Sequence, residues 1–186
     1  MKMSIKNMVC QRCISSVQQI FDAHNIPLSS ISLGEVDTFN SISDMEYLQL
    51  KKDLEKSGFE VLENQSKIKI DKVKTILIKK ISTLDIAEDF LLSKFISEKL
   101  ASDYSALSKL FSQTEHYTIE QYFILQKVEK VKELLMYNEC TLTEISHKLG
   151  YKSVQHLSNQ FKKITGFAPT QFQQLKEKKR IELDKI

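Results

Sequence analysis

The sequence has few of the residues that make turns: its 186 residues include 4 glycines, 2 prolines and no tryptophan. All-β sandwiches and barrels need many glycine- and proline-containing turns between short strands, so these folds are excluded. Hydrophobic residues make up 41% and charged residues 27% of the chain, which is ordinary for a globular protein and argues against global disorder. We therefore expect one domain or two small ones, built from long helices with short polar connections.

Long apolar runs are also missing. The most apolar stretch, residues 73–81, is interrupted by Lys74, Lys79 and Lys80, whereas a helix that spans a bilayer needs roughly 20 apolar residues. Residues 1–13 contain no continuous apolar segment of the kind found in signal peptides. We expect a cytoplasmic protein without a membrane partner, in which the three cysteines are thiols.

The charge is unevenly distributed along the chain. Residues 1–66 hold 6 basic and 9 acidic residues (net −3), whereas residues 67–186 hold 21 basic and 15 acidic residues (net +6). A basic segment suits a polyanionic partner, although lysines on helices are often only a solvated face. The C-terminal part is therefore the candidate for contact with a nucleic acid.

The first 64 residues alternate between strand and helix patterns. We expect strands over residues 1–7, 29–37 and 59–62, a helix over 11–23, and a second helix that begins after Ser43 and ends at Gly58. Ser43 and Glu46 have the spacing of a capping box. The apolar face of this second helix is expected to consist of Tyr47, Leu48, Leu50 and Leu54.

From residue 65 onward the pattern is helical throughout. The expected helices cover residues 67–82, 91–100, 104–113, 119–137, 142–149, 154–164 and 170–179. No long segment rich in Pro, Gly or Ser separates the two parts. We therefore predict two domains, an α+β domain over residues 1–64 and an all-α domain over residues 65–186.

Residues 141–170 carry the most informative pattern, which is a helix, a tight turn and a second helix. Gly150 permits the left-handed conformation that ends the first helix, Tyr151 fills the corner, and Ser153 caps the second helix. The residues expected to be buried are Leu142, Ile145, Leu149, Leu157, Phe161 and Ile164. The second helix then presents amides near its start and lysines near its end, which suits base edges and phosphates in a major groove.

A weaker copy of this pattern lies 50 residues earlier. Leu107-Ser-Lys-Leu-Phe111 corresponds to Leu157-Ser-Asn-Gln-Phe161, and it follows a helix over 92–100 and a turn at 101–103. Two helix-turn-helix units would then be joined by the helix over 119–137. This fixed register disfavours the alternative of a helical bundle whose lysines are merely solvated.

Residues 67–176 resemble the DNA-binding domain of the AraC/XylS family of bacterial transcription regulators. The resemblance rests on Tyr104-Ser-Ala-Leu-Ser-Lys-Leu-Phe111, Ile119-Glu-Gln-Tyr122, Val128-Glu-Lys-Val-Lys-Glu-Leu-Leu135, Gly150-Tyr-Lys-Ser153 and Gly166-Phe-Ala-Pro169. It implies seven helices and two recognition helices that enter successive major grooves on one face of double-stranded DNA. It also implies DNA contacts from Tyr104, Ser105, Ser108 and Lys109 in the first recognition helix, and from Val154, Gln155, His156, Asn159, Lys162 and Lys163 in the second. Arg180 is the sole arginine of this half, so neither recognition helix can read guanine through Arg.

The N-terminal part contains a pair of cysteines in Met8-Val-Cys-Gln-Arg-Cys13. Thiolates are soft ligands that favour Cu(I) and also bind Zn(II), and a helix N-terminus with Arg12 stabilises their charge. Residues 1–63 resemble the heavy-metal-associated domain, which is ferredoxin-like and implies a soft metal such as Cu(I) at Cys10 and Cys13. Asn7 departs from the family pattern, and no separate strand can be identified between residues 37 and 43, so the sheet has three or four strands.

Two alternatives to metal binding remain open for Cys10 and Cys13. They could form a redox-sensing dithiol, or the domain could be degenerate and its thiols could only pack. A zinc site that includes His24 is improbable, because this residue lies about 16–18 Å away at the far end of the helix.

The leading hypothesis is a sequence-specific transcriptional regulator that binds DNA and RNA polymerase and is modulated by a soft metal. Two helix-turn-helix units in one chain permit binding as a monomer or as a dimer. The alternative is a metal- or redox-handling, chaperone-like protein whose helical half is a docking module. We predict that the chain is not an enzyme, because it lacks a nucleophile–base pattern, a phosphate-binding glycine-rich loop and a carboxylate cluster.

Overall fold

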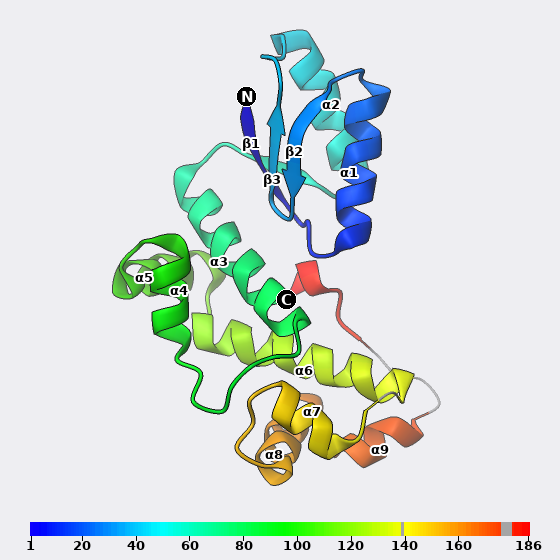
Figure 1. Ribbon diagram of the computed structural model, residues 1–186, viewed down its shortest axis with the longest axis vertical. Helices are drawn as coiled ribbons and strands as arrows, with labels where there is room; N and C mark the ends of the chain where they lie inside the picture. Colours follow the sequence, from blue (N-terminus) through cyan, green and yellow to red (C-terminus); the bar gives the residue numbers. More distant parts are fainter. Residues whose placement is uncertain (139, 176–179) are drawn as a thin grey trace. The chain divides into compact units, whose positions relative to one another are not determined.

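A computed structural model describes residues 1–138, 140–175 and 180–186. The chain forms two compact units, Met1–Thr75 and Ile76–Ile186 (Figure 1). Helix α3 (Gln65–Ser82) begins in the first unit and ends in the second. Among the described residues, no helix combines the length and the apolar character needed to cross a bilayer.

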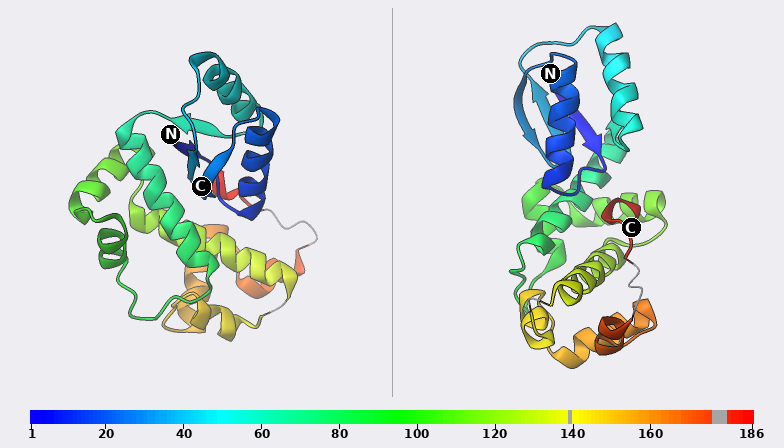
Figure 2. Two further views of the ribbon diagram at one scale, coloured as in Figure 1. Left: turned by 45° about the horizontal axis from the view of Figure 1, so that its top comes forward. Right: turned by 90° about the vertical axis from the view of Figure 1, so that its right-hand side faces the viewer.

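The first unit is a four-stranded antiparallel sheet with two helices. Its elements are β1 (Lys2–Lys6), α1 (Gln11–Ala23), β2 (Leu28–Ser32), β3 (Glu35–Thr38), α2 (Asp44–Lys56) and β4 (Glu60–Leu62). The strands lie in the order β2-β3-β1-β4, and α1 and α2 cover one face of the sheet (Figure 2). Ile5 and Val36 from the sheet pack there with Phe21 of α1 and Leu54 of α2, and all four are fully buried.

The sheet corrects two expectations. The predicted single strand over 29–37 is in fact a hairpin, in which Ile31 pairs with Val36 across a turn at Leu33 and Gly34, so a three-stranded sheet is wrong. Leu48 is 58% exposed instead of buried. Because each helical residue advances by 100°, Tyr47, Leu50 and Leu54 share the core face of α2 while Leu48 points away.

The second unit is built around one long helix. Its elements after α3 are α4 (Leu92–Leu100), α5 (Tyr104–Glu115), α6 (Ile119–Tyr137), α7 (Leu142–Lys148), α8 (Val154–Thr165), α9 (Pro169–Gln174) and the 3₁₀ turn η1 (Leu183–Lys185). Figure 1 shows α6 between the pair α4–α5 and the group α7–α9, and α6 contacts α5, α8 and α9. The predicted helix over 170–179 ends at Gln174 in the described part of the chain, and residues 176–179 lie outside it.

The first turns of α3 belong to the first compact unit, so the two units divide within this helix and not at its start. Lys72 Nζ lies 2.9 Å from Glu35 Oε1 of β3. Gly34 in the β2–β3 turn faces Asp71 and Thr75, and a Cβ atom at Gly34 would lie 3.2 Å from Thr75 Oγ1. The hairpin that sequence patterns missed therefore holds the beginning of α3.

Candidate nucleic-acid interface

The second helix-turn-helix unit consists of α7 and α8, and its local signals are those predicted. Gly150 has a φ of +63°, and the amide of Tyr151 donates to the Ser146 carbonyl at 2.8 Å. Ser153 Oγ accepts from the His156 amide at 3.1 Å and caps α8. The inner faces of the two helices are buried through Ile145, Leu149, Leu157 and Phe161.

The outer face of α8 is polar and basic. Gln155, His156, Asn159, Lys162 and Lys163 are exposed, and Val154 is half-buried. Gln155 Nε2 donates to Asn159 Oδ1 at 2.9 Å, so the two amides form one unit on the surface. Ile164, which was expected to be buried, is 36% exposed, because it lies in the last turn of α8 before the chain turns away at Gly166.

The first helix-turn-helix unit consists of α4 and α5. Ala101 has a left-handed conformation with a φ of +46°, and Asp103 caps α5 by accepting from the Ala106 amide at 2.8 Å. Ser105 and Lys109 are exposed on the outer face, whereas Tyr104 and Ser108 are half-buried.

Tyr104 makes an intramolecular contact that its sequence position does not reveal. Its hydroxyl donates to the Glu120 carboxylate at the start of α6. Burial and this carboxylate raise the pKa of the Tyr104 phenol well above its usual range. The phenol is therefore neutral and engaged with Glu120, while Ser105 and Lys109 are the freely exposed side chains of the predicted set on α5.

The two units repeat each other more fully than the sequence motif suggested. The starts of α4, α5 and α6 lie 50 residues before those of α7, α8 and α9. In the first copy Phe111 packs on Tyr122 with ring centroids 5.8 Å apart, and in the second Phe161 packs on Phe172 at 5.5 Å. The signal was present in the sequence, because the offset of 50 residues also relates Gln121 to Gln171 and Tyr122 to Phe172.

The corner between α7 and α8 is held by residues that sequence analysis did not single out. A Cβ atom at Gly150 would lie 2.6 Å from the Ala87 carbonyl oxygen and 2.9 Å from that of Ile86, so the segment before α4 packs directly on this turn. The Ile86 amide donates to the Lys148 carbonyl at 3.1 Å. On the α6 side, Lys127 Nζ lies 3.7 Å from the centroid of the Tyr151 ring.

Helix α6 also buries an ion pair. The Lys132 ammonium contacts the Glu129 carboxylate, and the two side chains are 9% and 3% exposed. Arg180 donates to Glu133 at 3.1 Å, and the Ile181 amide donates to Glu129 at 3.1 Å, so the segment after residue 179 is fixed to α6. This arrangement satisfies the buried charges that the helix carries.

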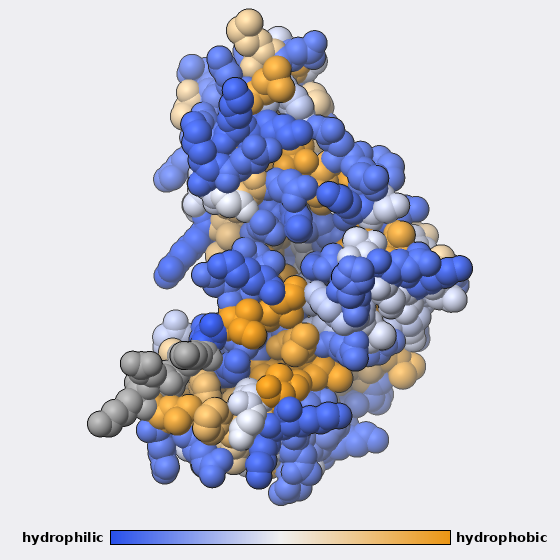
Figure 3. Space-filling view, turned by 180° about the vertical axis from the view of Figure 1, so that it is seen from behind, coloured by the Kyte–Doolittle hydropathy of each residue, from blue (hydrophilic) through white to orange (hydrophobic). Residues whose placement is uncertain are grey.

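The surface of the molecule is mostly hydrophilic, with several apolar patches (Figure 3). The large apolar side chains that remain exposed in the helical unit include Leu91, Tyr137 and Phe167. Scattered exposure of this kind is normal on a protein surface.

The cysteine pair lies at the beginning of α1. Cys10 is exposed at the N-cap, Cys13 is half-buried, and their sulfur atoms are 3.5 Å apart. Burial raises the pKa of the Cys13 thiol. Met8 is in the core at 2% exposure, and within the described ranges no group of three or more His, Cys, Asp or Glu side chains could hold a metal.

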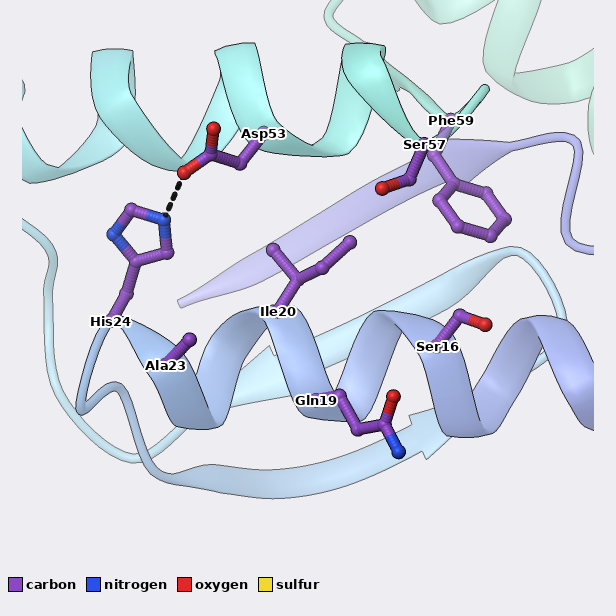
Figure 4. Close-up of a pocket in the computed structure, with 8 residues that line it drawn as sticks. All are labelled: Ser16, Gln19, Ile20, Ala23, His24, Asp53, Ser57 and Phe59. Atoms are coloured by element: carbon purple, nitrogen blue, oxygen red, sulfur yellow. Dashed lines mark hydrogen bonds and ion pairs between the residues drawn. The ribbon is translucent and has the colours of Figure 1, made fainter.

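His24 is separate from the cysteines, as expected. It lies at the far end of a groove of about 380 Å³ between α1 and α2, where its Nε2 is 3.0 Å from Asp53 Oδ2 (Figure 4). The floor of the groove is formed by Ile20 and Phe59. The imidazole is therefore engaged by a carboxylate of α2 and not by a thiol.

Comparison with known proteins identifies the helical part. Residues 96–175 match the family described as "Helix-turn-helix domain". This part of the chain is a helix-turn-helix domain of the AraC type. The match includes α5, α6, α7 and α8 together with most of α4 and α9, and therefore both predicted recognition helices.

Relatives of this helix-turn-helix domain are regulatory proteins by name. The "F1 operon positive regulatory protein" of Yersinia pestis is 32% identical over 99 residues, which are 50% of this chain and 33% of that protein. The chain thus matches about a third of the length of this relative. As these names suggest, the domain is regulatory and not enzymatic.

Solved structures share the fold of the helix-turn-helix domain. The C-terminal domain of AraT, a response regulator from Geobacillus stearothermophilus, has a TM-score of 0.51 at 23% identity, covering 61% of this chain and 87% of that one. The C-terminal domain of the two-component response regulator yesN from Fusobacterium nucleatum has a TM-score of 0.47 at 27% identity, covering 55% of this chain and 99% of that one.

Proposed function

We propose that this protein is a sequence-specific transcriptional regulator that acts in the cytoplasm and binds double-stranded DNA through α5 and α8. The observation that carries the proposal is the repeat of two capped helix-turn-helix units, 50 residues apart, on either side of α6. The match of residues 96–175 to the helix-turn-helix domain supports it. The same match disfavours the alternative of a metal- or redox-handling protein with a helical docking module.

The side chains of α8 support base reading by amides. Gln155 and Asn159 use one donor and one acceptor in their mutual hydrogen bond, which leaves one amide oxygen and one amide NH₂ directed outward. Adenine presents one acceptor and one donor in the major groove, whereas guanine presents two acceptors. We therefore propose that the Gln155–Asn159 pair prefers adenine.

Other side chains on the two helices have supporting roles. Lys109, Lys162 and Lys163 are exposed and would meet phosphates, while Ser105, Ser108, Val154 and His156 would contact the groove. The resemblance also places Tyr104 at the DNA, where its phenol would act while bonded to Glu120.

The experiment that tests this function is an in vitro selection with the full chain on a library of random duplexes. We expect recovery of a defined sequence whose affinity exceeds that of a scrambled duplex by at least about 10³-fold. Replacement of the adenine read by α8 with guanine should weaken binding by about 10-fold or more in the wild type. The same change should have little effect in the Asn159→Ala variant. Equal binding to all duplexes would refute the proposal.

We also propose RNA polymerase as a protein partner, because the Yersinia relative is named as a positive regulatory protein. Either a monomer or a dimer could bind, since each chain holds two helix-turn-helix units. Transcription with purified polymerase on the selected duplex tests this partner, and sedimentation with that duplex gives the number of chains bound.

For the first unit we propose a ferredoxin-like, heavy-metal-associated domain that binds Cu(I) through Cys10 and Cys13. The β-α-β-β-α-β order and the strand order β2-β3-β1-β4 support this assignment. The donor set also fits, because two soft thiols without a third ligand group suit Cu(I), whereas Zn(II) takes four ligands. Anaerobic titration with Cu(I) should give one bound ion, which the Cys10→Ser variant loses and the matched Cys140→Ser variant retains.

A further inference from the structure

Lys127 of α6 is a buried cation whose neighbours are aromatic rings. The residue is 7% exposed, and its Nζ lies 3.7 Å from the centroid of Tyr151 and 5.6 Å from that of Phe123. In the described part of the chain, no carboxylate lies within ion-pair distance of this ammonium. The face of an aromatic ring attracts a cation, and this attraction is stronger where water is excluded.

The ring beneath Lys127 leads directly to α8. The Tyr151 hydroxyl donates to Gln160 Oε1 at 2.8 Å, and the edge of the ring meets His156 with centroids 5.5 Å apart at 84°. Both partners lie on α8, and His156 is on its exposed face. One aromatic side chain therefore joins the central helix to the second recognition helix.

The fold by itself gives no reason for a lysine at this position. Burial penalises the charged form, and it lowers the pKa of Lys127 to about 8. A methionine side chain of similar length would fill the same space without this penalty. The charge is therefore retained at a cost in stability, and its visible contact is the Tyr151 ring.

We propose that Lys127 is a positioning residue for DNA recognition, because its ammonium fixes the Tyr151 ring and thereby the orientation of α8 on the base pairs. The inference rests on the proposed DNA-binding function. It predicts that stability and specificity respond in opposite directions when the charge is removed. A residue with a merely structural role would lose both together.

The test uses the full chain, the duplex recovered by selection and a scrambled duplex of equal length. In Lys127→Met we expect the ratio of the two affinities to fall by about five-fold or more, with a melting temperature equal to or above that of the wild type. The dependence of affinity on salt should not change, because no phosphate contact is removed. Lys127→Arg, which keeps a cation over the ring, should keep the ratio within about two-fold of the wild type.

Two controls separate this role from a general effect of charge. Lys130→Met removes another lysine of α6, which is paired with Glu133 at 2.5 Å, and should leave the affinity ratio unchanged. In a Tyr151→Leu background, Lys127→Met should have no further effect on the ratio, because the two residues act through one contact.

Three results would overturn the inference while leaving DNA binding intact. They are an unchanged ratio in Lys127→Met, an equal loss of affinity for both duplexes with a salt slope smaller by about 1, or a loss of specificity that parallels a lower melting temperature. Failure of the wild-type chain to select any sequence would refute the proposed function itself.

Discussion

Gly150 and Gly166 provide a matched pair of substitutions within one helix-turn-helix unit. Both have left-handed backbones, with φ values of +63° and +82°, so an alanine at either position is strained by about 1 kcal/mol. They differ in their surroundings. A Cβ atom at Gly166 meets nothing within 4 Å, whereas one at Gly150 would lie 2.6 Å from the Ala87 carbonyl oxygen.

The contact at Gly150 adds two costs to the backbone strain. The neighbours are main-chain oxygens that cannot rotate away, so the 86–87 segment must move, and such overpacking typically costs about 1–3 kcal/mol. The movement also endangers the hydrogen bond from the Ile86 amide to the Lys148 carbonyl, which contributes about 1 kcal/mol. We therefore expect Gly150→Ala to lower the free energy of unfolding by about 3–5 kcal/mol, and Gly166→Ala to lower it by about 1 kcal/mol.

The measurement is urea unfolding of the full chain, followed by circular dichroism at 222 nm, where the helical unit dominates. A shift in the midpoint at constant slope gives the change in stability. Equal destabilisation by the two substitutions would show that the 86–87 segment does not pack on the corner in solution. The reasoning about this corner would then be wrong, although the left-handed conformation of both glycines could stand.

Three further predictions concern charge and capping. Because the folded pKa of Lys127 is about 8 and its ordinary value is 10.5, the folded state binds fewer protons between these values. Unfolding free energy should therefore rise by up to about 3 kcal/mol over this range, and the rise should be absent in Lys127→Met. Ser153→Ala should cost about 1 kcal/mol in urea unfolding, and Ser153→Asp should restore it. Lys72 and Lys2 hold the pKa of Glu35 below its usual range, so Glu35→Gln should destabilise the chain at neutral pH. That difference should disappear as the pH falls through this lowered pKa, which acid titration of both proteins would measure.

Features determined by a few neighbouring residues could be predicted from the sequence. The capping box at Ser43 and Glu46 is present, as are the left-handed Gly150 and the cap at Ser153. Each depends on a spacing of three or four residues, which local patterns contain. The outer face of α8 was predictable for the same reason, because it is the complement of the buried positions Leu157 and Phe161.

The β2–β3 hairpin shows where local patterns become ambiguous. Ile31, Leu33 and Val36 were interpreted as one strand, although Ile31 and Val36 are opposite each other in neighbouring strands. A two-residue turn interrupts the alternation so briefly that one long strand and two short ones give nearly the same pattern. Gly34 at the turn was the available signal for a hairpin.

Helix α6 shows why the residues that position α8 could not be found from periodicity. The predicted inward residues Val128, Val131 and Leu135 are buried, but so are Lys127 and Lys132, because the helix is enclosed on several sides. Periodicity assigns a lysine to solvent, and it cannot anticipate a neighbour that the fold brings from a distant segment.

The two buried lysines of α6 nevertheless differ in what they can do. Lys132 is compensated by Glu129 on the same helix, so its contact stabilises α6 and transmits nothing beyond it. Lys127 is compensated by the ring of Tyr151, which is itself bonded to α8. A charge whose counterpart lies on the recognition unit ties the position of that unit to the central helix. For this reason we expect substitutions at Lys127, and not at Lys132, to change which DNA sequence is bound without first unfolding the chain.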